Sequence, residues 1–188
     1  MTLGAALPVL LAANPTRRFA GVCVAFVGLT AGVGAARYAG FDVALVHDSM
    51  SWTSRMIAVP ALGPAFVALL WGRKIIKPYW YGLSLLLGGI GWALPPDYAL
   101  VPGVVAMLLI LGVAARTYAR APKVALAAGL GVLAVSLAGL LIGTRGQWAG
   151  LLRIDLFHYA LAVGHAALGY ALWGLAREPV AAEAQPAL

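Results

Sequence analysis

Long apolar blocks, separated by short polar or proline-containing breaks, run through most of the chain. Six blocks have about the length of a membrane-crossing helix: 19–38, 52–71, 79–94, 99–116, 123–143 and 154–174. A helix rises 1.5 Å per residue, so about 20 apolar residues cross a hydrocarbon core of roughly 30 Å. The pattern predicts an all-α fold, a polytopic transmembrane helical bundle with six full helices.

A shorter apolar stretch, Leu3–Ala13, precedes these blocks and ends at Asn14-Pro15. At about 11 residues it is short for a span, so we expect a shortened first helix or an interfacial one. If it spans, the bundle has seven transmembrane helices. We predict a single transmembrane domain over residues 1–176 and a short, disordered cytoplasmic tail over 177–188.

Composition supports the membrane interpretation. The chain is 63% hydrophobic and 10% charged, whereas soluble domains have about a quarter charged residues. The net charge of +7 does not indicate a nucleic-acid partner, because the basic residues lie in short breaks and not in a patch interleaved with aromatic residues. Membrane lipids are the expected partners.

The basic residues divide unevenly between the two sides of the predicted bundle. The larger set contains Arg17, Arg18, Arg73, Lys74, Lys77, Arg116, Arg120, Lys123 and Arg177; the smaller contains Arg37, Arg55, Arg145 and Arg153. The positive-inside rule places the larger set, and with it the C-terminus, in the cytoplasm. The six tryptophans lie at predicted helix ends or in loops, as in the aromatic belts of membrane proteins. Glycine pairs such as Gly28 and Gly32 indicate close helix contacts.

Three ionisable residues of the last block, Asp155, His158 and His165, share one helix face at 100° per residue. Such groups are costly in a bilayer, so each is a candidate functional residue. We expect Asp155 and His158 to face the interior, hydrogen-bonded to each other or to a neighbouring helix. The alternative places Asp155 at the helix N-terminus, where a carboxylate is favourable.

A second polar group lies in the predicted outer loop 39–51, where His47 and Asp48 are adjacent, and Arg55 follows in the next block. These residues lie on the same predicted side of the membrane as Asp155 and His158, so all five can form one outer polar site. The alternative is a solvated loop and an arginine that extends to the headgroups.

Metal and haem binding stay open on this sequence. Zinc needs three or four ligands at roughly 2 Å, and His158 and His165 are about 10.5 Å apart along a helix, too far to share one ion. A zinc site would need His47, Asp155 and His158 together. Two-histidine haem ligation would need His47 with His158 or His165. We predict no catalytic residue and no cofactor.

The stretch Arg153-Ile-Asp-Leu-Phe-His-Tyr, with Trp173-Gly-Leu-Ala after it, resembles the last helix of small bacterial seven-helix membrane proteins. These are distantly similar to the alkaline ceramidase and progestin-receptor superfamily of hydrolases. The resemblance implies a bacterial cytoplasmic membrane, an outside N-terminus and an inside C-terminus. In the hydrolases, last-helix histidines four apart hold zinc, and the second helix carries a serine and a histidine. Here Ala162 and Leu161 stand where those histidines would be, and block 19–38 has neither serine nor histidine.

These observations favour a non-catalytic integral membrane protein, either a subunit or accessory of a larger membrane complex or a lipid-binding helical module. A metal-dependent hydrolase of ceramide-like lipid amides, using His47, Asp155 and His158, with His165 as a further candidate, is the first alternative. A haem-binding electron-transfer protein is the second.

Overall fold

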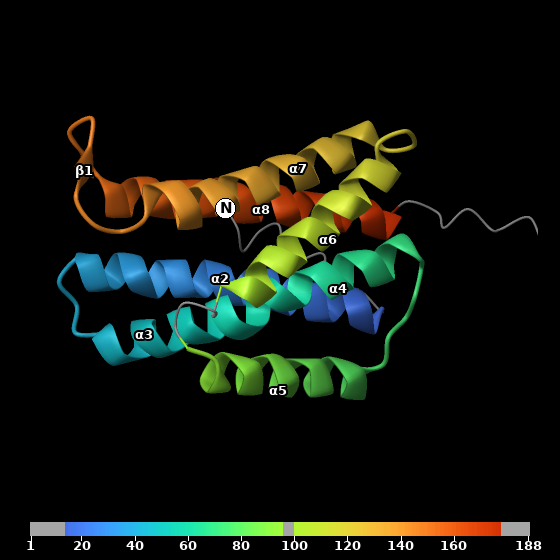
Figure 1. Cartoon of the computed structure of the whole chain (residues 1–188), viewed down its shortest axis with the longest axis horizontal. Coiled ribbons are helices and arrows are strands. Elements are labelled where there is room, and N and C mark those ends of the chain that lie inside the picture. Colours follow the sequence, from blue (N-terminus) through green and yellow to red (C-terminus); the bar gives the residue numbers. More distant parts are fainter. Residues whose placement is uncertain (1–13, 96–99, 178–188) are drawn as a thin grey trace, which may run out of the picture.

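The computed structural model describes residues 14–95 and 100–177, which form six helical rods and one short hairpin (Figure 1). The rods are α2 (Pro15–Tyr38), the continuous α3 (Ala44–Thr53), η1 (Ser54–Ala58) and α4 (Val59–Leu70), α5 (Lys77–Ala93), α6 (Val101–Thr117), α7 (Pro122–Ser136) with η3 (Leu137–Ile142), and α8 (Arg153–Arg177). The antiparallel hairpin pairs β1 (Gln147–Trp148) with β2 (Leu151–Leu152). The predicted all-α fold is confirmed, and each of the six apolar blocks forms a helix. The first apolar stretch and the tail from residue 178 lie outside the described residues.

Three of these helices are long and apolar enough to cross a membrane. They are Pro15–Tyr38, Ala44–Leu70 and Pro122–Ile142, with mean hydropathies of 2.0, 1.5 and 2.4. Val101–Thr117 is apolar but shorter. Several separate spans in one chain indicate an integral, multi-pass membrane protein.

The second rod begins eight residues earlier than the sequence predicted, at Ala44 instead of Trp52. The connection after α2 is therefore short, and Gly40 turns the chain there with a φ of +94°, a conformation that glycine adopts without steric cost. His47 and Asp48 lie on helix α3 and not in a loop. Because His47 and Asp48 are polar, the predicted apolar block begins after them, at Trp52. The helix nevertheless includes both residues in its first turns.

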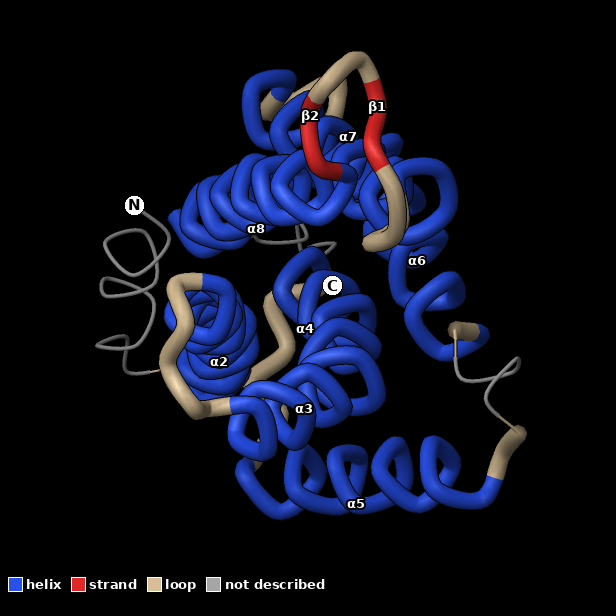
Figure 2. Tube along the Cα trace, turned by 90° about the vertical axis from the view of Figure 1, so that its left-hand side faces the viewer, coloured by secondary structure: helices blue, strands red, loops and turns tan. Residues whose placement is uncertain are grey.

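The two ends of the bundle differ in their connections and charge. One end, which we call the hairpin end, has the α2–α3 connection and the β1–β2 hairpin; the other, the basic end, has the α4–α5 and α6–α7 connections (Figures 1 and 2). The carboxylates of the described residues, Asp42, Asp48 and Asp155, all belong to segments at the hairpin end. The basic end has the predicted larger set of basic residues from Arg17 to Lys123.

Glycine brings several helix pairs into backbone contact. A Cβ placed on Gly131 of α7 would lie 3.0 Å from the carbonyl oxygen of Gly164 on α8, and one on Gly164 would lie 3.1 Å from that of Gly131. On α4, a Cβ at Gly63 would lie 2.6 Å from Ala106 Cα of α6. Helices in lipid associate mainly through such close van der Waals packing, since apolar burial gives little gain there.

Side chains also fasten the α4–α5 connection to the start of α2. The Asn14 side chain caps α2 by accepting from Thr16 N, and the Thr16 hydroxyl donates to Arg73 O and accepts from Ile75 N at 3.0 Å. Trp80, which we expected in the aromatic belt, is buried and stacks on Phe19 with 4.5 Å between ring centroids. The Trp80 side chain of α5 therefore packs within the bundle at the basic end.

The contact between Gly63 and Ala106 generates a stability prediction. Gly63→Ala places a methyl group against backbone, so α4 and α6 must separate, and we expect destabilisation of about 1–3 kcal/mol. Gly112→Ala on α6 is the control, because in the described part of the chain nothing lies within 4 Å of its Cβ; the better helix propensity of alanine should leave it neutral or stabilised by up to about 1 kcal/mol. Unfolding midpoints in detergent measure both. Equal midpoints for the two variants would contradict the tight α4–α6 contact.

Candidate functional site

Helices α2, α3 and α8 bring two histidines together at the hairpin end. A Cβ placed on Gly34 of α2 would lie 2.8 Å from His47 Nε2 of α3 and 3.5 Å from His158 Nε2 of α8. Both imidazoles therefore reach the same point on α2, and they can do so because Gly34 has no side chain. We call the polar residues around this point the hairpin-end cluster: Arg37, His47, Asp48, Ser51 and His158.

Hydrogen bonding determines which nitrogen of His47 carries the proton. Arg37 Nη1 lies 3.1 Å from His47 Nδ1 and also forms an ion pair of 2.5 Å with Asp48. A guanidinium only donates hydrogen bonds, so His47 Nδ1 accepts. Asp48 lies farther from this nitrogen, at 3.5 Å, and is already paired with Arg37. His47 is therefore the neutral tautomer with its proton on Nε2, and its side chain is only 13% exposed.

The tautomer of His47 determines how it interacts with Ser51, which lies one helical turn later. The Ser51 hydroxyl lies 3.3 Å from His47 Nε2, and the Nε2 proton points to the serine oxygen. In a serine nucleophile the direction is reversed, because a carboxylate holds the Nδ1 proton and leaves Nε2 free to take the hydroxyl proton. Arg37 occupies the position of that carboxylate here. His47 therefore does not activate Ser51 as a nucleophile. The Ser51 hydroxyl can donate its proton to another group.

His158 has the opposite tautomer. Its Nδ1 lies 2.7 Å from Ile154 O, one turn earlier on α8, so Nδ1 donates and Nε2 presents a lone pair. His158 Nε2 has no hydrogen-bond partner among the described residues. Unlike His165 Nε2, it is not fully buried. Tyr38 packs edge-on against both histidines, with ring centroids 6.4 Å from His47 and 5.6 Å from His158.

Together these groups offer a donor on α3 and an acceptor on α8: the Ser51 hydroxyl contacts His47 Nε2, which approaches Gly34 as His158 Nε2 does. Ser51 can donate its hydroxyl proton, His158 Nε2 can accept, and the charges of Arg37 and Asp48 compensate each other. An uncharged group that both donates and accepts, such as a hydroxyl or an amide, complements this pattern. A free anion or cation would find no net opposite charge within the cluster.

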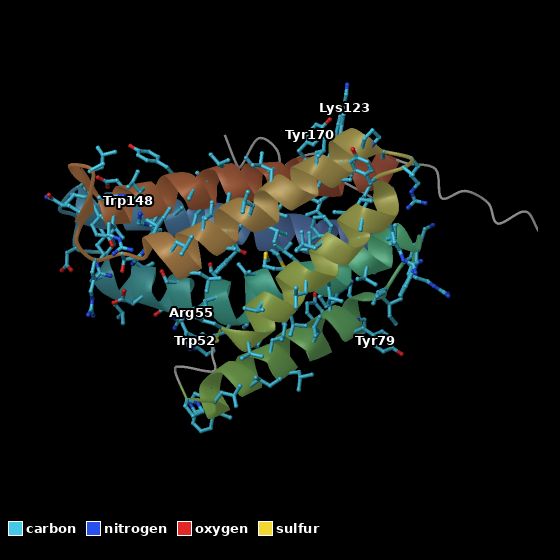
Figure 3. All side chains as sticks on the ribbon, turned by 45° about the horizontal axis from the view of Figure 1, so that its top comes forward. Trp52, Arg55, Tyr79, Lys123, Trp148 and Tyr170 are labelled. Atoms are coloured by element: carbon cyan, nitrogen blue, oxygen red, sulfur yellow. The ribbon has the colours of Figure 1, made fainter. Side chains whose placement is uncertain are left out.

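The structure joins only part of the predicted site. His47, Asp48 and His158 come together, whereas Arg55 is exposed in η1 and forms no hydrogen bond or ion pair within the described residues. Figure 3 shows Arg55 next to Trp52 and apart from Trp148 of the hairpin. Asp48 of α3 forms an ion pair with Arg37 of α2.

The predicted interior position of Asp155 and its hydrogen bond to His158 were wrong. Asp155 is exposed in the first turn of α8, and His158 bonds to a backbone carbonyl instead. A carboxylate at a helix N-terminus is stabilised by the helix dipole without being buried, which is the alternative that the sequence left open. The candidate zinc ligands His47, Asp155 and His158 are thus not brought together, and no three His, Cys, Asp or Glu residues of the described chain form a metal-binding group.

His165 lies deeper in α8 and is separate from the cluster. It is 2% exposed, its Nδ1 bonds to Leu161 O at 2.8 Å, and its Nε2 is buried without a partner among the described residues. The backbone carbonyl satisfies half of this imidazole, which lowers the cost of placing a histidine there.

Sequence reasoning missed Gly34, Arg37 and Ser51. The spacing of four between His47 and Ser51 was visible, but it has meaning only on a helix, and these residues were predicted in a loop. Arg37 was counted only among the four basic residues of the outer side. A helix extended back to Ala44 would have placed Asp48 and His47 opposite it.

Comparisons with protein families, curated proteins and solved structures found no match for this chain. The geometry of the site therefore carries the functional argument.

The two tautomers can be measured directly. In protein labelled with ¹⁵N-histidine at neutral pH, we expect His47 to be protonated at Nε2 and His158 at Nδ1, with distinct nitrogen shifts. Arg37→Met removes the donor to His47 Nδ1 and should shift the His47 signals while leaving those of His158 in place. A His47 protonated at Nδ1 in the unmodified protein would contradict the assignment, because Ser51 would then face a basic nitrogen.

Proposed function

We propose that this chain is a non-catalytic, lipid-binding helical module of a bacterial cytoplasmic membrane. The six described helical rods cross the bilayer, and Leu3–Ala13 adds a seventh span. The hairpin end faces outward and the basic end faces the cytoplasm, as the positive-inside rule predicts from the charges. The basic residues of the α4–α5 and α6–α7 connections, Arg73, Lys74 and Arg120, support this orientation.

The observation that carries the proposal is the approach of His47 Nε2 and His158 Nε2 to Gly34, with the Ser51 hydroxyl 3.3 Å from His47 Nε2. Ser51 cannot be activated by His47, so the cluster has the polarity of a binding site and not of a nucleophile. It lies where α2, α3 and α8 meet, at the depth where a lipid headgroup enters the bilayer. An uncharged headgroup with a hydroxyl or amide would accept from Ser51 and donate to His158 Nε2.

Exposed glycines support the related role as a subunit or accessory of a larger membrane complex. Gly32 of α2 and Gly139 of η3 are exposed, and within the described chain nothing lies within 4 Å of a Cβ on either. Small residues on lipid-facing surfaces are typical of helix–helix contacts. A partner helix can therefore pack closely against α2 while the hairpin-end cluster remains in place.

A metal-dependent lipid hydrolase is the second candidate, favoured by one observation. Two imidazole Nε2 atoms approach one point beside Gly34, as two ligands of one zinc ion would. Binding metal would require His47 to give up its Nε2 proton and a third ligand to join from outside the described set. This candidate thus needs changes that the lipid-binding proposal does not.

The proposed orientation predicts labelling from opposite sides. In a Cys23→Ala background, Gln147→Cys in the hairpin should react with a membrane-impermeant thiol reagent added to intact cells. Lys74→Cys in the α4–α5 connection should react only after the cytoplasmic side is exposed. Labelling of Gln147→Cys from the cytoplasm alone would reverse the orientation, and labelling of both from one side would contradict the spans between them.

Lipid retention tests the proposed function. The purified protein is reconstituted in phosphatidylcholine vesicles that contain dioleoylglycerol, and bound lipid is measured by native mass spectrometry after mild solubilisation. We expect dioleoylglycerol to stay bound, and His158→Leu to weaken retention about fivefold to tenfold, the value of one hydrogen bond of about 1 to 1.4 kcal/mol. Asp155→Asn, on the same helix but exposed, should retain as much lipid as the unmodified protein.

Other outcomes of this experiment separate the alternatives. Equal retention by His158→Leu and the unmodified protein would contradict lipid binding at the cluster. Equimolar zinc together with release of fatty acid from a short-chain ceramide would favour the hydrolase. Co-isolation of another chain from native membranes, with no lipid retained at the cluster, would favour the subunit role.

A further inference from the structure

An apolar groove of about 340 Å³ runs between α6 and α7 next to the connection that joins them. Its floor is made of small residues, among them Ala114, Ala125 and Gly129, whereas larger side chains form its rim. The rim residues are Leu111, Tyr118, Leu126 and Leu130, each at least 41% exposed. The alternation of small and large residues on the two helices creates the groove.

Unpaired positive charge lies next to the α6–α7 connection, at one end of this groove. Arg120 lies in the connection, Lys123 in the first turn of α7, and Arg116 in the last turn of α6, on a face turned away from the groove; all three are exposed. None forms a hydrogen bond or ion pair with the described residues, whose carboxylates belong to the opposite end of the bundle. Figure 3 shows Lys123 extending away from the ribbon. Tyr118 on the rim is amphipathic, as residues at headgroup depth commonly are.

We propose that the groove binds one acyl chain of an anionic phospholipid, whose phosphate group interacts with Arg120 and Lys123. An apolar surface within a bilayer is covered by acyl chains, and cations at headgroup depth attract anionic lipid at about 1 kcal/mol each. A zwitterionic lipid would bring its own cation next to these two basic residues. This site lies at the other end of the molecule from the hairpin-end cluster and selects a charged headgroup. Lipid binding at one site can therefore be disproved without disproving lipid binding at the other.

Matched charge variants test the headgroup interaction. The purified full-length protein is reconstituted in vesicles of phosphatidylcholine and phosphatidylglycerol, and retained phosphatidylglycerol is measured by native mass spectrometry. Arg120→Gln with Lys123→Gln should weaken retention about fivefold for each charge removed. Lys74→Gln with Lys77→Gln removes the same charge from the α4–α5 side of the basic end and should change retention less. Equal losses in the two double variants would overturn the site in favour of general surface charge.

A second pair of variants tests the groove itself without changing charge. Gly129→Phe fills the groove, and no described atom lies within 4 Å of a Cβ there, so the helices need not move. Gly112→Phe places the same side chain on open α6 surface outside the groove. We expect Gly129→Phe to lose phosphatidylglycerol at least fivefold and Gly112→Phe to retain it, at unchanged unfolding midpoints. Full retention by Gly129→Phe would overturn the proposal, because the acyl chain would then lie elsewhere.

Discussion

Close approach of helix backbones at glycine is the constraint on which both the packing and the polar site depend. Between helices in lipid there is little hydrophobic gain, so stability comes from contact distance and from hydrogen bonds. Gly131 and Gly164 bring α7 and α8 together, and Gly63 lets α4 meet α6 at Ala106. At the hairpin end, Gly34 serves the same purpose for two imidazole rings. A side chain at Gly34 would occupy the point at which His47 and His158 converge.

Once the rings meet, a single donor determines the polarity of the cluster. Arg37 donates to His47 Nδ1, so the proton of that imidazole must lie on Nε2 and point to Ser51. On His158 the backbone carbonyl of Ile154 has the equivalent role and leaves Nε2 as an acceptor. The two histidines therefore differ in hydrogen bonding although both rings meet at Gly34. Asp48 forms an ion pair with Arg37. The cluster therefore has no net charge, although a guanidinium lies next to the partly buried His47 ring.

The fold class followed from the sequence because lipid leaves few alternatives. Backbone polar groups within a bilayer must pair inside each segment, so apolar blocks of this length form helices. Helix ends were less predictable, because hydropathy reports where the bilayer ends and not where backbone hydrogen bonding ends. The rod that contains α3 shows the difference: its first turns contain His47, Asp48 and Ser51 and are helical nevertheless.

The candidate site was only partly predictable for the same reason. His47 and His158 were recognisable as rare ionisable residues, but their convergence depends on the α3 extension and on Gly34, neither of which has a charge pattern to reveal it. Asp155 was misplaced because helical spacing places it near His158, whereas the energetics of the first helical turn keep it exposed. Periodicity gives the face of a residue and not its hydrogen-bond partner.

The separation of charge along the bundle gives the two ends different chemistry. Charges in a bilayer protein are confined to its ends, so a carboxylate at one end cannot compensate a cation a membrane thickness away; the Debye length at physiological ionic strength is about 8 Å. At the hairpin end, Arg37 has Asp48 within contact distance, and the remaining donor and acceptor act as neutral groups. At the basic end, Arg116, Arg120 and Lys123 have no carboxylate among the described residues, so their counterions must come from outside those residues. The two proposals therefore assign uncharged polar groups to the end with compensated charge and anions to the end with uncompensated charge.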